Sequence, residues 1–430
     1  MEGTMGGKVR VALACSVFAA CLASTGTALG MGKTVCASGC AYTSIQAAIN
    51  GSAEGATITI AKGTYVENVV VNKPVTLQGS GKETVLEPAV SKPVCVGGSL
   101  CGGTASNVIL VEADNVTITK LSVEGDNPSL TSGVVVGGKD IDARNGIITN
   151  HLVGVFNNLT VSNVAVADIY LRGIYASSGG SFNFNHDMVK NVQAEEASIA
   201  MFAFEGSGSM DDNSVTEAND ALSANWSKGI EFAGNKVTKS GSGVHTDNNG
   251  GSGGSADLIK GNKVSECKLD GYGVWVFAPY VSATLEGNSV KGCAVGLAAF
   301  GGSVAGQGPR FAANKVDGTG ASASESLTYG ALITTDQLGF GFGDVTATLT
   351  GNRLKDASTG LFVTQESGGQ ANVTASGNAI YKNTAGANGG TGTVVEAASN
   401  WWGCQQGPAS AKCNSAKGTV NYTLWLTAKP

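Results

Sequence analysis

The chain has 430 residues, of which 42% are hydrophobic, and this content is too high for a disordered, glycine-rich polypeptide. Its net charge of −6 and the lack of any basic run argue against nucleic acid as a partner. Only 14% of the residues are charged whereas 63 are glycine, a composition typical of short strands and tight corners rather than of helices.

The chain begins with the pattern of a secretory signal peptide, which we predict to cover residues 1–30. Lys8 and Arg10 precede an apolar stretch at 11–23, and small residues follow up to the expected cleavage site. The apolar stretch is too short to span a bilayer comfortably and no later segment could span one. We therefore predict a secreted or cell-surface protein without a transmembrane segment. Cys21 leaves lipid attachment open as an alternative to ordinary cleavage.

Ten asparagines recur in one local context and divide the rest of the chain into similar units. The surrounding residues repeat too, as in F-A-G-N-K-V, I-K-G-N-K-V and L-T-G-N-R-L. Such a period in Val-, Ile- and Gly-rich sequence indicates a solenoid, because one unit is too small to bury its own apolar face. The asparagines are Asn163, Asn185, Asn213, Asn235, Asn262, Asn288, Asn314, Asn352, Asn378 and Asn400.

A second repeat follows the asparagines and reads R-G-I-Y-A-S at 172–177, S-G-V-H-T-D at 242–247 and Y-G-V-W-V-F at 272–277. Alternate positions are aliphatic or small, so we predict a strand with two inward columns. Two or three strands per turn, each paired with its counterpart one turn later, predict an all-β fold. This fold is a single right-handed parallel β-helix of about 10–12 turns over residues 31–430. The asparagines would lie at its corners and hydrogen-bond to one another along the axis.

Both ends of the predicted β-helix carry sequences typical of caps. In the N-terminal cap, residues 31–60, the apolar residues of 42–50 have helical spacing, so a short helix would cover the first turn. The C-terminal cap, residues 400–430, begins with the Trp401–Trp402 pair, which we predict to be a hydrophobic lid. A disulfide-closed loop and a final apolar strand at 422–426 would complete it.

Removal of the signal peptide leaves eight cysteines, an even number that suits an oxidising compartment. Three pairs each enclose a short loop, whereas the members of the fourth lie five residues after their asparagines in neighbouring turns. Stacked strands run about 4.8 Å apart, a separation that a disulfide accepts. With no C-x-x-C pair and only three histidines, a zinc site is not expected. The predicted disulfides are Cys36–Cys40, Cys95–Cys101, Cys267–Cys293 and Cys404–Cys413.

These residues resemble the secreted right-handed β-helix proteins of the pectate lyase-like superfamily. The resemblance lies in S-I-Q-A-A-I-N at 44–50, G-T-Y-V-E-N-V-V-V at 63–71, V-T-L-Q-G-S-G at 75–81 and N-W-W-G at 400–403. It covers nearly the whole chain after the signal peptide and implies the fold and a carbohydrate-facing role. The catalytic signatures of pectin methylesterases, polygalacturonases and alginate epimerases are absent, so the resemblance does not imply one reaction.

The residues between the inward columns point outward, and over 172–300 they form one patch of aromatic, acidic and basic side chains. Aromatic faces stack on sugar rings, whereas Asp, Asn and Arg bind hydroxyl or carboxylate groups. A flat strand face of this kind suits an extended polysaccharide as the partner. We identify as candidate catalytic residues His245, Arg172, Tyr272, Asp247 and Asp220, and as candidate substrate-binding residues Tyr175, Asn225, Trp275, Phe277 and Phe300.

Two reactions are compatible with this patch. In β-elimination from a uronic acid, Arg172 would neutralise the carboxylate, and His245 or Tyr272 would serve as base or proton donor. Hydrolysis would need two carboxylates about 5–9.5 Å apart. Asp220 and Asp247 are five positions apart along the strand direction, which is about 16 Å at roughly 3.3 Å per residue. We therefore favour a polysaccharide lyase-like enzyme acting on a uronate-containing or other acidic glycan.

Two less specific interpretations remain open. The protein could be a non-catalytic glycan-binding, adhesive or structural cell-surface β-helix, with solvated charges and with aromatic residues packed beneath a loop. Asp140 and Asp142 could help to bind Ca²⁺, or could pair with Arg144. We expect a monomer and no other cofactor.

Overall fold

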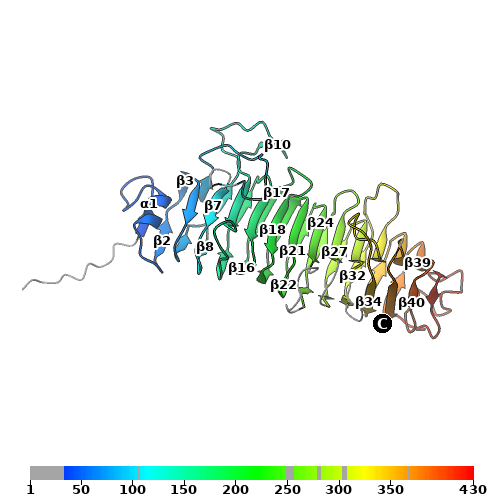
Figure 1. Ribbon diagram of the computed structural model, residues 1–430. Helices are drawn as coiled ribbons and strands as arrows, with labels where there is room; N and C mark the ends of the chain where they lie inside the picture. The colour runs from blue at the N-terminus through cyan, green and yellow to red at the C-terminus, as the bar shows by residue number, and fades with distance from the viewer. Residues whose placement is uncertain are drawn as a thin grey trace, which may run out of the picture. The chain divides into compact units, whose positions relative to one another are not determined.

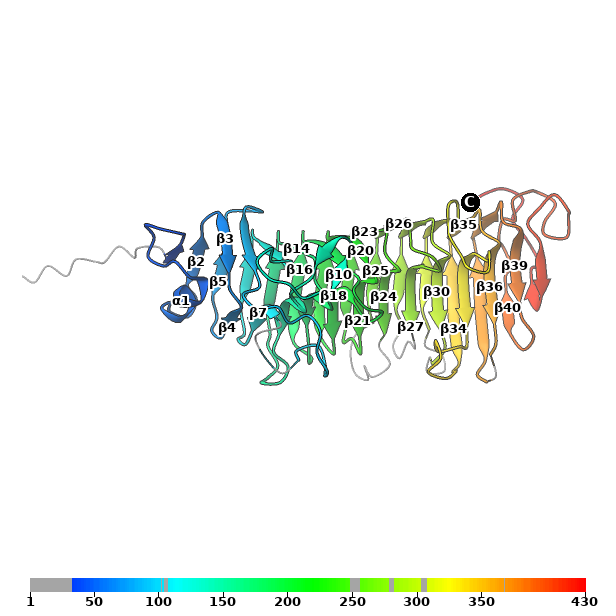
Figure 2. The same ribbon diagram turned by 90° about the horizontal axis from the view of Figure 1, so that it is seen from above.

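The computed structural model describes residues 33–101, 103, 107–247, 256–277, 282–302, 308–366 and 368–430. Over these residues the chain winds into the predicted right-handed parallel β-helix, whose three sheets A, B and C are visible in Figures 1 and 2. The predicted signal peptide, with Cys21, lies outside the described residues. Among the residues that the structure describes, no helix is long and apolar enough to cross a membrane.

Sheet A has 15 strands. They are β1 (Lys33–Val35), β2 (Thr57–Ile60), β5 (Thr76–Gln78), β8 (Thr117–Thr119), β13 (Leu159–Ser162), β16 (Ser181–Asn185), β19 (Ser207–Asp211), β22 (Ile230–Ala233), β25 (Leu258–Lys260), β28 (Thr284–Glu286), β31 (Arg310–Ala312), β34 (Val345–Thr350), β37 (Ala371–Ser376), β40 (Val394–Glu396) and β42 (Val420–Asn421).

Sheet B has 12 strands, most of them short. They are β3 (Gly63–Val66), β6 (Thr84–Glu87), β9 (Ser122–Glu124), β14 (Ala165–Ala167), β17 (Met188–Val192), β20 (Ser214–Ala218), β23 (Lys236–Thr238), β26 (Lys263–Ser265), β29 (Ser289–Lys291), β32 (Lys315–Asp317), β35 (Arg353–Lys355) and β38 (Ala379–Tyr381).

Sheet C has 13 strands and carries the second sequence repeat. They are β4 (Val69–Val71), β7 (Asn107–Val111), β12 (Asn145–Thr149), β15 (Arg172–Ala176), β18 (Ile199–Phe204), β21 (Asp220–Asn225), β24 (Ser242–Asp247), β27 (Tyr272–Phe277), β30 (Val295–Phe300), β33 (Tyr329–Thr334), β36 (Thr359–Thr364), β39 (Ala385–Gly389) and β41 (Ala416–Gly418). Outside the three sheets, β10 (Val135–Val136) and β11 (Lys139–Asp140) form an antiparallel hairpin.

One hydrophobic core runs through the stacked turns, and the predicted inward columns of sheet C line it. Val244 pairs with Val274, which in turn pairs with Leu297, and all three are fully buried. Alternation along a strand of period 2 turns the residues between them to the opposite face. The core columns therefore fix which side chains of sheet C face outward.

The asparagine ladder lies at the corner between sheets A and B. In a typical step the backbone and side-chain amides of Asn262 donate to Oδ1 of Asn288 at 2.9 and 3.0 Å, and Asn262 Nδ2 also donates to the carbonyl of Phe232. Each buried amide thus satisfies backbone groups of the corner. The ladder comprises Asn213, Asn235, Asn262, Asn288, Asn314, Asn352, Asn378 and Asn400.

The prediction was wrong for the first two asparagines, Asn163 and Asn185. The ladder position before Asn213 belongs to Asp187, which donates its N–H to Asn213 Oδ1 at 2.9 Å and accepts the N–H of Val164 at 2.8 Å. The ladder position thus lies two residues after Asn185, where an aspartate replaces the expected amide, and one residue after Asn163, where Val164 offers no side-chain amide. Oδ2 of Asp187 is buried without a hydrogen-bond partner, and burial raises the pKa of this carboxyl to about 8.

The N-terminal cap is confirmed and the C-terminal cap in part. Helix α1 (Ile45–Asn50) buries Ile45, Ala48 and Ile49 over the first turn. Trp402 is fully buried at the far end of the core. The predicted final strand at 422–426 is absent, because pairing ends at Asn421 and the positive φ of Leu424 breaks the extended conformation.

The structure joins the cysteines in the four predicted pairs: Cys36–Cys40, Cys95–Cys101, Cys267–Cys293 and Cys404–Cys413. Cys267 and Cys293 connect neighbouring turns where sheet B passes into sheet C, with Cα atoms 4.7 Å apart. That distance equals one strand-to-strand step of the solenoid.

Candidate functional site

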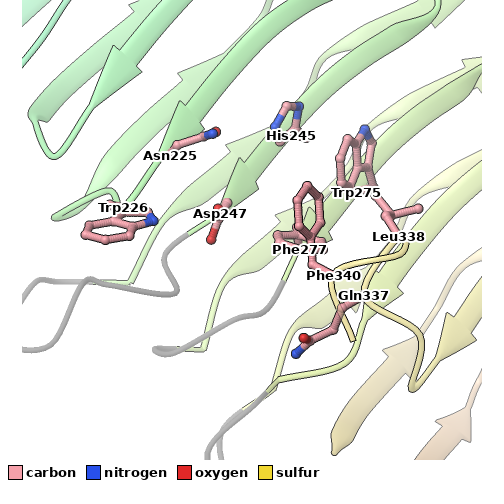
Figure 3. Close-up of a pocket in the computed structure, with 9 residues that line it drawn as sticks. All are labelled: Asn225, Trp226, His245, Asp247, Trp275, Phe277, Gln337, Leu338 and Phe340. Atoms are coloured by element: carbon pink, nitrogen blue, oxygen red, sulfur yellow. The ribbon is translucent and has the colours of Figure 1, made fainter. Parts of the chain in front are cut away.

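A pocket of about 530 Å³ lies on the outward face of sheet C, over β21, β24 and β27. Figure 3 shows Trp226 on one side, Phe277 and Trp275 on the other, and polar side chains between them. The loop after β33 contributes the far edge. The residues that line the pocket are Asn225, Trp226, His245, Asp247, Trp275, Phe277, Gln337, Leu338 and Phe340.

The parallel register sorts the outward side chains into two columns. Since each strand pairs with its neighbour residue for residue, side chains of the same column are about 4.8 Å apart. One column contains Ser223, His245 and Trp275, and the next contains Asn225, Asp247 and Phe277.

Both ring nitrogens of His245 are engaged. Nε2 lies 2.9 Å from the hydroxyl of Ser223, and Nδ1 lies 3.1 Å from Oδ2 of Asp220. The second contact has the distance of an ion pair, although Nδ1 makes no well-aligned hydrogen bond. His245 is 7% exposed and Ser223 is fully buried, so the ring is held in one orientation. Ser223 belongs to the predicted outward column but was not among the candidate site residues, because a lone serine on a strand carries no distinguishing signal.

Trp275 forms a wall of the pocket. Its ring stacks on the imidazole of His245 with centroids 4.1 Å apart and planes 19° apart, and its Nε1 donates to Ser242 Oγ at 2.8 Å. Phe300 packs edge-on against the indole at 5.5 Å and is only 2% exposed. Phe300 therefore supports Trp275 and does not itself line the pocket.

Two exposed aromatic rings flank the pocket. Trp226 is 44% exposed and stacks on Phe204 at 5.7 Å, whereas Phe340 is 85% exposed and lies 6.2 Å from Phe277. Neither was predicted from the sequence. The alternation G-F-G-F-G at 339–343 is a signal that could have pointed to Phe340, because glycines free such a loop to present its aromatic residues.

The register also separates the two candidate carboxylates. Asp220 pairs with Ser242 at the start of the strands and Asp247 pairs with Asn225 at their ends, as the five-position separation predicted. Asp247 is 8% exposed and lines the pocket, whereas Asp220 lies behind His245.

Arg172 and Tyr175 belong to a separate cluster. Strand β18, which the predicted columns omitted, lies between β15 and β21, so Arg172 is three strands from β24. Its guanidinium lies over Phe202, 5.0 Å from the ring centroid, and donates to the carbonyl of Ala197. Burial lowers the pKa of Arg172 to about 10 and raises that of Tyr175, which stacks on Phe202, to about 12.

Tyr272 also lies away from the pocket. It lines a smaller hollow of about 230 Å³, together with Tyr329, Asp270 and Glu325. Burial and the nearby carboxylate of Asp336 raise the pKa of Tyr272 above its ordinary value. Five predicted residues therefore line the pocket, and Asp220 contacts one of them from behind; the five are His245, Asp247, Asn225, Trp275 and Phe277.

The suggested calcium ligands do not converge. Asp140 Oδ1 accepts the N–H of Ser132, and Asp142 Oδ2 accepts the N–H of Asn127. Arg144 donates to backbone carbonyls instead of pairing with either aspartate. Over the described ranges, no group of three or more His, Cys, Asp or Glu side chains is arranged to hold a metal ion.

Comparisons with known proteins bear on the fold. No family model matches the chain, and no curated protein sequence matches it. Among solved structures, the A-module of the mannuronan C-5 epimerase AlgE6 from Azotobacter vinelandii is similar with a TM-score of 0.51 and 17% identity, over 90% of this chain and 94% of that one. The catalytic domain of a GH87 alpha-1,3-glucanase in complex with tetrasaccharides also has a TM-score of 0.51, at 14% identity, over 85% of this chain and 65% of that one. At such identities the likeness establishes the parallel β-helix fold.

Proposed function

We propose that the protein is an extracellular polysaccharide-binding β-helix that takes a sugar unit into the sheet C pocket and acts on it through His245. The observation that carries this proposal is an imidazole of fixed orientation between aromatic walls in an open hollow. Aromatic rings stack on the apolar faces of sugars, and amide and carboxylate groups bind their hydroxyls. Both similar structures belong to proteins named for polysaccharides, mannuronan and an α-1,3-glucan, which is compatible with this role.

A lyase-like reaction on a uronate-containing glycan is the chemistry we propose. The imidazole would take the proton from the carbon beside the carboxylate, a double bond would form to the next ring carbon, and the glycosidic C–O bond there would break. The leaving oxygen would take a proton from solvent. Nε2 of His245 would have an unshared electron pair for this step when the Ser223 hydroxyl donates its proton to Oδ1 of Asn225, which lies 3.1 Å away, and not to Nε2. Asp220 would keep the ring oriented.

Non-catalytic glycan binding is the second candidate, and one observation favours it. β-Elimination requires that the carboxylate charge be offset, and the described lining contains neither Lys nor Arg. The amides of Asn225 and Gln337 and the imidazole of His245 would have to provide this stabilisation, while Asp247 opposes it. Arg172, the cation predicted for this role, is covered by its own cluster.

The decisive experiment measures three readouts on wild type and His245→Gln, with linear polyuronates and neutral glucans as polymers. A lyase produces new ultraviolet absorbance from unsaturated ends, a hydrolase produces reducing ends only, and a binding protein produces neither but retains affinity. We expect absorbance that His245→Gln abolishes while affinity changes less than threefold. If no polymer is either bound or converted, both candidates are refuted.

The extracellular part of the proposal draws on the disulfides. Four disulfides in one chain are typical of an oxidising compartment, and the N-terminal sequence pattern is that of an export signal. Detection of the mature protein in the culture medium with an N-terminus near residue 30 would test secretion directly.

A further inference from the structure

A column of cations runs along the outward face of sheet B. Each occupies the first position of its strand, directly after a ladder asparagine, and the strands stack in register. Lys236 pairs with Lys263, Lys263 with Ser289, Ser289 with Lys315, and Lys315 with Arg353. Between Lys236 and Arg353, only the turn of Ser289 lacks a cation in this column, and that turn carries Lys291 two positions later.

These side chains point into solvent without a partner of opposite charge. The residue after each is inward and buried, as Val264 and Val316 are, whereas Lys236, Lys263, Lys315 and Arg353 are exposed. Within the described chain none of the four forms a salt bridge. Asp317, the acidic residue at the third position of β32, already forms a salt bridge with Lys355, whose Nζ lies 2.7 Å from Oδ2 of Asp317.

The column is unfavourable for the isolated protein. Like charges in directly opposed positions of neighbouring strands repel and destabilise a sheet. The chain as a whole is acidic, with a net charge of −6, so neither composition nor surplus positive charge explains a row of cations at one register position. A bound polyanion would turn this mutual repulsion into a set of favourable contacts.

The spacing of the column defines the shape of the partner. From β23 to β35 there are four strand-to-strand steps, about 19 Å at roughly 4.8 Å each. In Figure 2 β23, β26 and β35 follow one another along the same side of the β-helix. A straight, narrow row suits a linear polymer with regularly spaced anionic groups. The outward positions of these strands hold Lys, Arg, Ser, Thr and Asp and no aromatic ring on which a nucleobase could stack.

We propose that sheet B carries a second binding site, in which Lys236, Lys263, Lys315 and Arg353 hold a linear anionic polysaccharide bearing carboxylate or sulfate groups. The site is on a different sheet from the pocket and does not depend on the chemistry proposed there. It would anchor the protein on an acidic polymer through charge alone. Its affinity therefore falls steeply with ionic strength, unlike stacking in the pocket.

The test compares two fourfold variants of equal net charge. The row variant is Lys236→Gln, Lys263→Gln, Lys315→Gln and Arg353→Gln. The matched control is Lys62→Gln, Lys82→Gln, Lys412→Gln and Lys417→Gln, all exposed positions outside the column. Binding to polygalacturonate, dextran sulfate and neutral dextran is measured by titration over a range of NaCl concentrations.

We expect the row variant to bind the anionic polymers at least about tenfold more weakly at low salt, with a shallower dependence of log Kd on log salt, and the control to match wild type. Polygalacturonate and dextran sulfate distinguish carboxylate from sulfate as the preferred group. His245→Gln should leave the binding of dextran sulfate unchanged, so failure of the pocket proposal and failure of the sheet B proposal are separable.

Three results would overturn the proposal: an equal loss in both fourfold variants, equal binding of neutral dextran, or tighter binding of a single-stranded polynucleotide or an anionic vesicle than of either polysaccharide. Folding is checked without ligand. Since the row variant removes only exposed, mutually repelling charges, its melting temperature should not fall below that of wild type. Dextran sulfate, which carries no uronate for the pocket, should raise the melting temperature of wild type and not that of the row variant.

Discussion

Sheets B and C share one core and one stacking direction, but their outward faces differ in character. The strands of sheet C around the pocket are six residues long, and the long connection from β33 to sheet A, between Thr334 and Val345, contributes the far edge of the pocket. The strands of sheet B at the cation column are three residues long, and three of the five pass into sheet C through a corner of three residues, as between Thr238 and Ser242, whereas a longer connection joins Asp317 to Tyr329. Long strands with loops build a walled hollow, whereas short strands with tight corners leave a flat row.

From this difference we expect recognition by shape on sheet C and recognition by charge on sheet B. On sheet C the outward side chains around the pocket pack against one another and are buried or half-buried, which suits specific contacts with a sugar ring. On sheet B they extend into solvent and can act only through charge. The two faces should therefore respond differently to the same kind of substitution.

The largest expected effect concerns the fixed imidazole. Replacing Asp220 by Asn removes the carboxylate that faces Nδ1 of His245 and should lower kcat by about 10²-fold or more, with KM changed little, because the sugar contacts remain. Steady-state kinetics on the polymer identified in the screen measure both constants. Lys263→Gln on sheet B is the control and should leave kcat unchanged; a parallel loss there would contradict the independence of the two faces.

The second prediction concerns the corner that both faces share. Asn288→Ala removes four hydrogen bonds of the ladder, those that join Asn288 to Asn262, Ile259 and Asn314. Buried donors and acceptors are left unpaired, so we expect a loss of about 3 kcal/mol in the free energy of unfolding. Denaturant titration measures it, and Ser289→Ala, on the exposed side of the same corner, should change stability by less than about 0.5 kcal/mol.

The third prediction uses Asp187, the carboxyl in the ladder. Burial raises its folded pKa to about 8, whereas in the unfolded chain an aspartate ionises near pH 4. The folded state therefore retains a proton that the unfolded state loses, and stability falls as the pH rises from about 4 to 8.

In Asp187→Asn this fall should disappear. The variant should equal wild type near pH 5 and exceed its free energy of unfolding by about 4 kcal/mol at pH 9, because wild type loses about 1.4 kcal/mol per pH unit up to the folded pKa and the orphan oxygen becomes an amide donor in the variant. Thermal or urea unfolding at the two pH values provides the measurement. An unchanged difference between pH 5 and pH 9 would show that Asp187 is not the group responsible.

The smallest effect is expected at the rim of the pocket. Phe340→Ala removes a ring that is 85% exposed, and should weaken glycan binding about fivefold without altering kcat, since the ring stands away from His245. Isothermal titration with the same polymer measures this loss. Val394→Ala, a half-exposed apolar side chain on sheet A, is the control and should have no effect on affinity.

The repeated features of the chain could be predicted from sequence, and the exceptions could not. Period-2 alternation identified the inward column of Val244 and Val274, and the asparagine spacing paired Cys267 with Cys293. Strand β18, with the sequence I-A-M-F-A-F, was left out of the predicted repeat, although Ala200 takes the place of the usual glycine there as Ala221 does in β21. Because the prediction left out β18, it placed Arg172 next to the strands of the pocket. In the structure the turn that contains β18 lies between Arg172 and these strands.

Of the residues in the site, only those on the outward face of the sheet C strands could be predicted from the sequence. His245, Asn225, Asp247, Trp275 and Phe277 follow from register and alternation, which are local properties of the repeat. The loop residues at the rim come from a connection more than 50 residues downstream, and nothing in the repeat specifies where it folds back. The contacts of His245 with a serine and an aspartate of the preceding strand could be recognised only from side-chain positions. In the sequence these two residues resemble any pair of solvated polar residues.

The disulfide between Cys267 and Cys293 bears on how such a chain can diversify. Duplication of one turn elsewhere in the ladder would leave every asparagine with a neighbour and cost the fold little. A turn inserted between these two cysteines would move their Cα atoms from 4.7 Å to about twice that separation, beyond what a disulfide spans. Variation in the number of turns is thus free along most of the ladder but blocked beside Trp275, so lineages should differ in length while preserving this one adjacency.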